Sequence, residues 1–414
     1  MWRELLREFL LDLRTHRTRA ILTLVAISWG TIAVVLLLAF GRGLANQMQA
    51  GTINAGNRIM ILYGGETGMQ FEGMPKGRKI RMVEEDAAML AQAIPMIAMI
   101  SPQYMGNVQL SYRKYVTNTS CEGVNPAFEE MRRMYPMAGG RFLNDVDVSE
   151  QRRVIVLGAR IAKDIFGDEE PVGGTLLVDG LPFTVVGILQ DKIQTSMNNG
   201  PDSYRAIVPC STFRTTYGPL RVSSIVVRPA DPSQQEELKS EIFRVLARKY
   251  RFDPRDERTL FIWDFIEQEK MGKKIDIGMS IFLGSIGFLT LLIAGVGVAN
   301  VMYVVVKERT REIGIKMAVG ARRSYIMSQF IFEALLLALL GGAAGILFSW
   351  GVVSIVSMIP AGEDGPMQFF NRPVLSGTII LLTTGILTLL GLLAGFFPAR
   401  RASSMDPVES LRYE

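Results

Sequence analysis

Residues 277–306 read IGMSIFLGSIGFLTLLIAGVGVANVMYVVV and contain no charged side chain, whereas Asp276 precedes them and Lys307 follows them. A helix needs about 20 apolar residues to cross a hydrocarbon core of roughly 30 Å. The stretch therefore predicts a transmembrane helix. Its residues would measure about 45 Å as a helix. We therefore expect it to tilt and to continue outward, with Phe265–Ile275 as a stalk.

Three further stretches are long and almost free of charge. Ala20–Gly41 and Pro373–Ala399 carry none, and Ser324–Pro360 carries only Glu333. Four such stretches in one chain predict four transmembrane helices rather than buried helices of a soluble protein. The first is longer than the apolar part of a secretory signal, which has about 7–15 residues, so we expect a retained anchor.

Basic residues gather on one side of the predicted spans. They lie before the first span (Arg3, Arg7, Arg14, Arg17, Arg19), between the second and third (Lys307, Arg309, Arg311, Lys316, Arg322, Arg323) and after the fourth (Arg400, Arg401, Arg412). Lys and Arg accumulate on the cytoplasmic side of a membrane. Both termini are therefore predicted to be cytoplasmic, in a protein of the inner (plasma) membrane whose large domain lies outside.

The predicted organisation assigns every part of the chain. It comprises a cytoplasmic amphipathic helix (1–19), a first transmembrane helix (20–41), a periplasmic α+β domain (42–274), a stalk with the second transmembrane helix (275–306), a cytoplasmic connection (307–323), a third transmembrane helix (324–360), a short external loop (361–372), a fourth transmembrane helix (373–399) and a cytoplasmic tail (400–414). The fold class expected is thus a four-helix membrane domain with a large α+β domain inserted between its first two helices.

The N-terminal segment shows apolar residues at helical spacing, namely Trp2, Leu5, Leu6, Phe9, Leu10 and Leu13. Such a helix is typical of the cytoplasmic membrane surface. Packing on a partner protein is the alternative.

Composition excludes several classes of function. The net charge is +5 and the pI about 9.1, but the basic residues adjoin the apolar spans. This placement indicates contact with lipid headgroups rather than with nucleic acid. Two cysteines and one histidine, His16, leave almost no material for a Cys/His metal site or a histidine-based triad.

The region between the first two spans has an α+β pattern. The predicted strands are Asn57–Tyr63, Arg153–Leu157, Leu176–Val178, Phe183–Leu189, Ile207–Pro209, Ser224–Val227 and Phe261–Trp263, and the predicted helices are Val83–Ile94, Ala159–Phe166 and Gln234–Tyr250. Asp179-Gly180 between two short strands is a strong hairpin signal. We expect two subdomains, the middle one an insertion of roughly 125–215.

Cys121 and Cys210 both fall in this region. An oxidising compartment permits a disulfide between them. Two free, buried thiols are equally compatible with the sequence, because spacing alone shows no proximity.

The chain contains no HExxH, GxSxG or GxxxxGK[ST] motif. We therefore expect a non-catalytic subunit without a cofactor of its own. If ATP drives the protein, the nucleotide site lies on another chain.

The connection 307–323, KERTREIGIKMAVGARR, has charged ends and a compact apolar centre, Ile313–Val319. A short helix bent at Gly320 would present this centre as an apolar knob, suited to a groove on a soluble partner. A polar connector with ordinary cytoplasmic charge is the alternative.

Three runs resemble the MacB/FtsX-type ABC transporter permeases. KERTREIGIKMAVGARRSYIMSQFIFEALLLALLGGAAGIL and FFPARRASSMDPVESLRYE are similar to the FtsX-type permease domain, and VIVLGARIAKDIFGDEEPVGGTLLVDGLPFTVVGIL is similar to the MacB-like periplasmic domain. The resemblance covers nearly the whole chain, and the run Glu312–Ala321 is its most specific part.

The resemblance implies an ABC permease that works as a dimer with two ATPase subunits, which bind ATP and magnesium and drive movements of the external domains. A second or homologous permease copy, a periplasmic adaptor and an outer-membrane channel are the other implied partners. The coupling helix on the ATPase would comprise Glu308, Arg311, Glu312, Ile313, Gly314, Lys316, Met317, Ala318, Gly320 and Ala321. MacB carries a fused ATPase, whereas this sequence begins about twenty residues before its first span, so we expect a separate one.

Two small-residue patterns, Gly341-xxx-Gly345 and Gly391-xxx-Gly395, predict close helix packing. For the fourth span we favour packing within the subunit. Glu333, a carboxylate within an apolar span, is a functional candidate by default. The simpler interpretation is that the Glu333 side chain reaches the membrane interface or pairs with Arg322 or Arg323.

Two classes of function fit these features. The first is an ATP-coupled exporter or extractor of cargo from the periplasm or the outer leaflet, including a lipoprotein-releasing permease. The second is an FtsX-like, non-transporting regulator of a cell-envelope hydrolase. The large, two-part external domain favours export.

Overall fold

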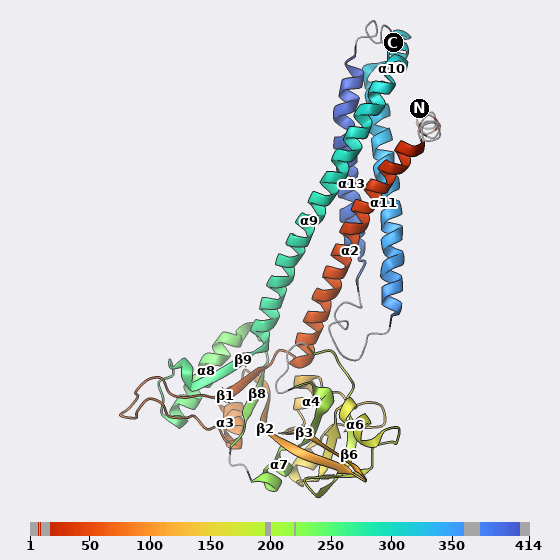
Figure 1. Cartoon of the computed structure of the whole chain (residues 1–414). Helices are drawn as coiled ribbons and strands as arrows, with labels where there is room; N and C mark the ends of the chain where they lie inside the picture. The colour runs from red at the N-terminus through yellow and green to blue at the C-terminus, as the bar shows by residue number, and fades with distance from the viewer. Residues whose placement is uncertain are drawn as a thin grey trace. The chain divides into compact units, whose positions relative to one another are not determined.

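A computed structural model describes Arg7, Phe9 and residues 17–194, 200–218, 221–359 and 373–405 (Figure 1). The chain forms two compact units. The helical unit contains residues 1–47 and 274–414, and the α+β unit contains residues 48–273. Most of the predicted N-terminal helix, the predicted loop 361–372 and the end of the tail lie outside the described residues.

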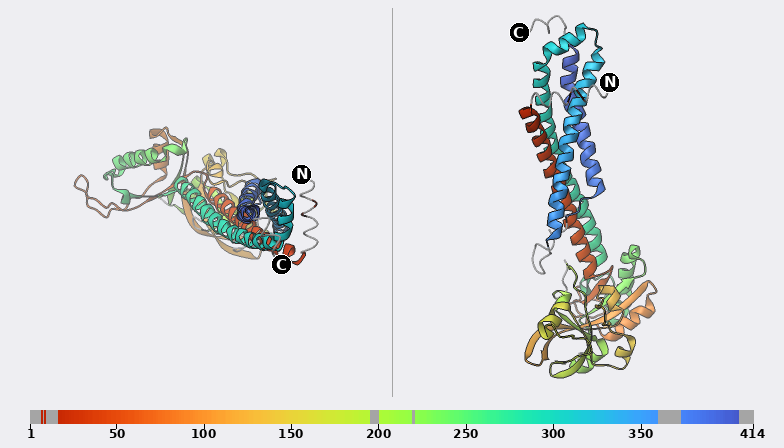
Figure 2. Two further views of the ribbon diagram at one scale, coloured as in Figure 1. Left: turned by 90° about the horizontal axis from the view of Figure 1, so that it is seen from above. Right: turned by 90° about the vertical axis from the view of Figure 1, so that its right-hand side faces the viewer.

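Within the described residues, four long helices are apolar enough to cross a membrane, as the sequence predicts. They are α2 (Arg17–Ala55), α9 (Phe265–Glu308), α11 (Arg323–Met358) and α13 (Gly377–Ser403). The short α10 (Thr310–Ala318) connects α9 to α11. Within the helical unit, α9, α11 and α13 lie side by side in both views (Figures 1 and 2). Their facing sides share an apolar cluster that includes Leu291, Met302, Phe330, Leu387 and the N-terminal Phe9.

Two helix ends differ from the predicted ones. The first helix continues past Gly41 to Ala55, and Arg42 within it lies 3.6 Å from Asp276 of α9. The last helix begins at Gly377 rather than near Pro373, since the Ser376 hydroxyl caps it by accepting from the Ile379 N–H. By contrast, α9 is one unbroken helix that includes the stalk residues from Phe265 onward.

One part of the α+β unit is a four-stranded antiparallel layer. Its order is β2-β8-β1-β9, formed by the first half of β2 (Ile97–Tyr112) with β8 (Ser224–Pro229), β1 (Met60–Gly64) and β9 (Leu260–Asp264). Side chains of α3 (Glu84–Ala93) and α8 (Gln235–Tyr250), such as Leu90 and Ile242, join a core with Met60, Leu62 and Ile225 of the sheet. Successive side chains of a strand point to opposite faces, so Met60 and Leu62 join this core, whereas Ile61 and Val226 are buried in a second apolar cluster.

The other part is a closed six-stranded barrel. The second half of β2 pairs with β3 (Tyr115–Val124), and the ring continues through β7 (Arg205–Pro209), β4 (Val154–Leu157), β6 (Leu181–Ile188) and β5 (Thr175–Val178) back to β2. Closure leaves no free edge in this ring. The short helices α4 (Phe128–Arg132), α5 (Asp145–Ser149), α6 (Ala159–Phe166) and α7 (Cys210–Tyr217) flank these strands in the chain.

The predicted border of the inserted subdomain, near Asn125, is too late in the chain. The barrel pairing already begins at Tyr104, directly after the last residue of β2 that pairs with β8, Gln103. One continuous strand therefore serves both parts of the unit, and β3 belongs to the barrel.

Most other local predictions hold. Helix α6 spans the predicted residues, and β5 and β6 form the predicted hairpin. Its turn has Asp179 at φ 48° and Gly180 at φ 81°, which is the backbone conformation that an Asp-Gly pair favours. The sequence pattern gave no indication of β2, β3, α4, α5 or α7.

Candidate functional site

The predicted coupling segment folds as a short helix between two sharp bends. Arg309 is the single non-helical residue between α9 and α10, and its carbonyl accepts the first intrahelical bond, from the Ile313 N–H at 3.0 Å. After α10, Gly320 has φ +100°, and the Ala321 N–H returns to the Lys316 carbonyl at 3.0 Å. The bend expected at Gly320 is present because glycine tolerates this left-handed conformation.

The apolar centre Ile313–Val319 is not a single exposed knob, contrary to the expectation. Ile313 is buried at 3% exposure with Gly314, and Met317 is half-buried against the same apolar cluster. Ile315 and Val319 are exposed, at 49% and 84%. A helix places residues three and four apart on one side, so α10 divides into an inner and an outer apolar face.

The outer face is defined by Arg311, Glu312, Ile315, Ala318 and Val319, all of which are exposed. It combines a small apolar patch with charges of both signs. Glu312 also pairs with Lys316 at 3.2 Å along the helix. Such a face offers apolar area for a partner and charged groups for its orientation.

The inner side of α10 is held by polar contacts as well as by Ile313. The Lys316 ammonium lies 3.5 Å from the Gln329 amide oxygen of α11. Glu308, at the end of α9, accepts two hydrogen bonds of 2.6 Å from Arg19 of α2. Of the remaining predicted site residues, Ala321 packs partly buried against the apolar cluster.

Glu333 has a different partner from the one predicted. It is buried, and its carboxylate lies 3.4 Å from the guanidinium of Arg309. Arg322 and Arg323, the expected partners, are exposed. Arg323 precedes Glu333 by about ten residues of α11, roughly 15 Å along the helix, whereas Arg309, between α9 and α10, lies beside Glu333.

The four glycines of the small-residue patterns lie at close contacts within the chain. A Cβ at Gly341 or Gly345 would meet α2, at 2.8 Å from Ile27 and 2.7 Å from Thr31 respectively. A Cβ at Gly391 or Gly395 would meet Ala338 or Ala334 of α11. These contacts agree with the close helix approach expected of such patterns, and they lie inside one subunit.

Both cysteines are free and buried in the structure. Burial raises the pKa of the Cys121 thiol. Burial, and then the nearby Glu84 carboxylate, raise the pKa of Cys210 to about 12. The Cys210 thiol donates to the Asn125 side-chain oxygen at 2.6 Å. Of the two alternatives that the sequence left open, the structure has the free thiols.

A buried charge cluster in the α+β unit escaped the sequence analysis. Asp202 accepts from Arg132 at 3.0 Å and pairs with Lys192 at 2.9 Å, and Arg205 bonds to Glu122. Burial alone would raise the pKa of Asp202, but Arg132, Lys192 and Arg205 outweigh it, and the pKa is lowered. The cluster connects α4, β3 and β7 across the unit, and no local pattern in the sequence marks it.

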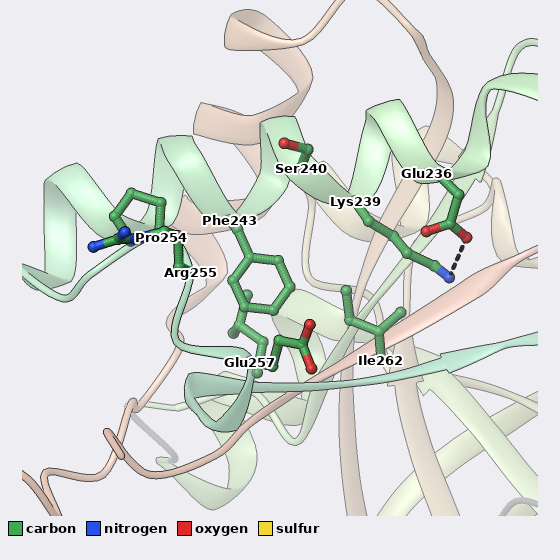
Figure 3. A pocket seen from close by; sticks show the side chains of 9 residues that line it. Glu236, Lys239, Ser240, Phe243, Pro254, Arg255, Glu257 and Ile262 are labelled. Atoms are coloured by element: carbon green, nitrogen blue, oxygen red, sulfur yellow. Dashed lines mark hydrogen bonds and ion pairs between the residues drawn. The ribbon is translucent and has the colours of Figure 1, made fainter. Parts of the chain in front are cut away.

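A groove of about 510 Å³ lies between α8 and β9 (Figure 3). Phe243, Leu260 and Ile262 line it with apolar surface. Its cations are already paired: Lys239 with Asp264 at 2.8 Å and with Glu236 at 2.9 Å, and Arg255 with Asp253 at 3.0 Å. Burial alone would lower the pKa of Lys239, but its hydrogen bonds to Asp264 and Glu236 raise it. The groove therefore presents no converging set of free cations to a ligand.

Among the residues that the structure describes, no three His, Cys, Asp or Glu side chains gather as metal ligands. The geometry instead defines a class of protein: within the described residues it is a membrane protein with four candidate spans, an α+β domain between the first two and a short connecting helix with one exposed face.

Comparison with known families assigns this permease more closely. Residues 20–245 match the MacB-like periplasmic core domain, and residues 284–407 match the FtsX-like permease C-terminal domain. The chain belongs to this family of ABC transporter permeases. It is accordingly a protein of the inner membrane with a periplasmic domain, which the α+β unit forms.

Individual relatives agree with the assignment. The chain is 28% identical over 404 residues to "Macrolide export ATP-binding/permease protein MacB" of Bdellovibrio bacteriovorus, covering 97% of this chain and 60% of the relative. It is 31% identical over 401 residues to "Pyoverdine export ATP-binding/permease protein PvdT" of Pseudomonas syringae, covering 96% of this chain and 58% of the relative. The chain thus spans about three-fifths of the length of these relatives.

Among solved structures, the periplasmic region of MacB from Actinobacillus actinomycetemcomitans is similar, with 21% identity and a TM-score of 0.43. The match covers 53% of this chain and 94% of that structure.

Proposed function

We propose that the chain is the permease subunit of an ABC exporter, in which ATP hydrolysis by an ABC-type ATPase moves the periplasmic domain and so exports or extracts cargo. Two observations support this: the chain belongs to a family of ABC permeases, and relatives named for export align with nearly all of it. The 414 residues contain no GxxxxGK[ST] motif. In this proposal the nucleotide and its magnesium are bound by the ABC-type ATPase.

The observation that carries the proposal is the two-sided character of α10. Its inner face is fixed to the helical unit by Ile313 and by the Lys316–Gln329 contact. Its outer face exposes Ile315 and Val319. A helix that is anchored on one side and apolar on the other suits a partner that pushes or pulls on it. We assign the outer face to the ATPase.

One long helix, α9, begins inside the periplasmic domain. Asp264, the last residue of β9, caps α9 by accepting from the Ile266 N–H at 2.8 Å and the Glu267 N–H at 3.1 Å. Phe265 is buried, and its N–H donates to the Ile59 carbonyl. No loop separates β9 from α9. The 44 residues of α9 would measure about 66 Å, which exceeds a hydrocarbon core. A stiff helix rooted in the sheet is a suitable element for passing movement to it.

The assembly follows from the same proposal. Two permease copies would stand with two ATPase subunits, and a periplasmic adaptor and an outer-membrane channel would complete an export route. Both termini and α10 are placed in the cytoplasm, because basic residues concentrate there and the ATPase needs access to α10.

The test separates the two faces of α10. The tagged chain is purified from its native host in mild detergent, and the ATPase that comes with it is identified and quantified. Losing the apolar area of Ile315 and Val319 weakens binding by about 1–2 kcal/mol, so Ile315→Ser with Val319→Ser should lower ATPase recovery about 5- to 30-fold. The thermal stability of this double variant should stay near that of the wild type, because both replaced side chains are exposed.

Ile313→Ser is the matched control. It removes a buried side chain and places a hydroxyl in an apolar cluster, so it should destabilise the helical unit by about 3–5 kcal/mol. ATPase recovery that is unchanged in the Ile315/Val319 variant would contradict the assignment of the outer face. If no ATPase accompanies the wild-type chain, the proposed function itself is wrong.

A further inference from the structure

The junction between α9 and α10 carries two adjacent residues of opposite charge, each paired with a different helix. Glu308 ends α9 and accepts from both terminal nitrogens of Arg19 on α2. Arg309, the next residue, pairs with Glu333 on α11 at 3.4 Å. Two consecutive residues thus join α2 and α11 to the same point of the chain.

The two pairs differ in burial. The Arg309 and Glu333 side chains are 17% and 7% exposed, whereas those of Arg19 and Glu308 are 29% and 42% exposed. Solvent and salt screen a buried pair much less than an exposed one. The Arg309–Glu333 pair is therefore the less screened of the two, whereas the two parallel hydrogen bonds of Arg19 to Glu308 fix an orientation.

Arg309 is the first of three contacts along one side of α10. Arg309, Ile313 and Lys316 follow each other at spacings of four and three residues. Arg309 and Lys316 contact Glu333 and Gln329 of α11, and Ile313 between them is buried in the apolar cluster of the helical unit. An apolar contact such as that of Ile313 permits rotation and sliding. A directional charge pair limits both, and it stands at Arg309, the one non-helical residue between α9 and α10.

We infer that Arg309 and Glu333 are positioning residues that make α11 move together with α10, and that Arg19 and Glu308 extend the same connection to α2. The inference rests on the proposed function, because it assumes that α10 receives movement from an ATPase. It goes beyond that function by naming the residues through which movement leaves α10.

The first test needs no ATPase. Hydrogen exchange of the α10 amides is measured on the purified chain. Glu333→Gln should raise their exchange about tenfold, since local opening becomes easier when a buried charge loses its counter-charge. The charge swap Arg309→Glu with Glu333→Arg should return the exchange of the α10 amides to within about twofold of the wild-type rate. Glu150→Gln, which removes an exposed carboxylate of the α+β unit, should leave it unchanged.

The second test measures coupling, which a merely structural role would not change. In the complex purified with its ATPase, two spectroscopic labels on the α+β unit report movement on ATP addition, and phosphate release reports hydrolysis. Glu333→Gln should retain the ATPase but reduce movement per ATP about fivefold or more, and the swap should recover most of it.

Unchanged exchange in Glu333→Gln overturns the inference, and so does a raised exchange with unaltered coupling. A swap that restores neither quantity also overturns it. Absence of any ATPase from the wild-type preparation refutes the proposed function instead, and the exchange measurement then still decides whether the pair positions α10.

Discussion

Replacing Gly345 by alanine tests the packing of the membrane helices most directly. Gly345 of α11 faces α2 so closely that an added Cβ would lie 2.7 Å from the Thr31 Cβ and 2.8 Å from the Ser28 carbonyl oxygen. Carbon atoms at optimal contact are about 3.5–4.0 Å apart. The second neighbour is backbone, which cannot rotate away, so α2 and α11 must separate.

The expected cost follows from three contributions. Overpacking of a close-packed interface costs about 1–3 kcal/mol. Separation also weakens the Ser28 hydroxyl bond to the Gly341 carbonyl, now 2.9 Å, and interhelical hydrogen bonds in membranes contribute about 0.6 kcal/mol. Alanine gains about 0.5–1 kcal/mol over glycine in a helix. The helical unit should therefore lose about 1–3 kcal/mol of unfolding free energy.

Gly351→Ala is the matched control on the same helix, because nothing lies within 4 Å of a Cβ there. It should be neutral or stabilising by about 0.5–1 kcal/mol. Both variants are unfolded in mixed micelles with increasing SDS and followed by far-UV circular dichroism. Gly345→Ala should be less stable than the wild type, and Gly351→Ala should be at least as stable as the wild type. Equal stability of Gly345→Ala and Gly351→Ala would refute the close approach of α2 and α11.

Two other predictions concern the α+β unit. Asp202→Asn leaves buried cations without their counter-charge and should cost about 3–5 kcal/mol at pH 7. Because the folded pKa of Asp202 lies below its ordinary value of 3.8, the stability it contributes is complete above that pH and is lost as the pH falls further. The free energy of unfolding, measured in urea, should thus be higher for the wild type than for Asp202→Asn, and this difference should narrow below pH 3.8. A difference that stays constant with pH would contradict the pairing. Cys121 and Cys210 are both buried, and the pKa of each thiol is raised. In the folded chain both should resist maleimide at pH 8 and react only after unfolding, which mass spectrometry can show. Rapid labelling of either thiol in the folded chain would be inconsistent with its burial.

Several features of this fold were predictable because their signals are local. The hairpin at Asp179-Gly180 needs only two residues that tolerate positive φ. Helix α6 ends at Gly167, whose φ is +62°, and its burial follows its apolar spacing. In the same way, Gly320 marks the end of α10.

The barrel could not be predicted in this way. Strand β2 contains Pro102, which usually argues against a strand, yet Pro102 pairs with Ile225 in the half of β2 that forms an edge of the four-stranded layer. The burial of β2 also lacks a clean alternation, because its two halves belong to different layers. Pairings between strands far apart in the chain decide such a pattern.

In the candidate site, too, some features were predictable from local sequence signals and others depended on contacts between distant segments. The charged ends and apolar centre of 307–323 predicted a short helix, and α10 is present. Which residues of it face outward depends on the helices packed against it, because Ile313 is buried in their apolar cluster whereas Ile315 is exposed. The partner of Glu333 depended on a fold-back that brings Arg309 to it.

The sequence by itself determined where the chain crosses the membrane and which family it resembles. Exclusion of charge from hydrocarbon is a cost at each residue, and it is therefore visible in any one stretch. Tertiary structure alone decided the barrel closure, the two faces of α10 and the pairing of Arg309 with Glu333. Each of these depends on which distant segments meet, since burial and ion pairing are properties of neighbours in space.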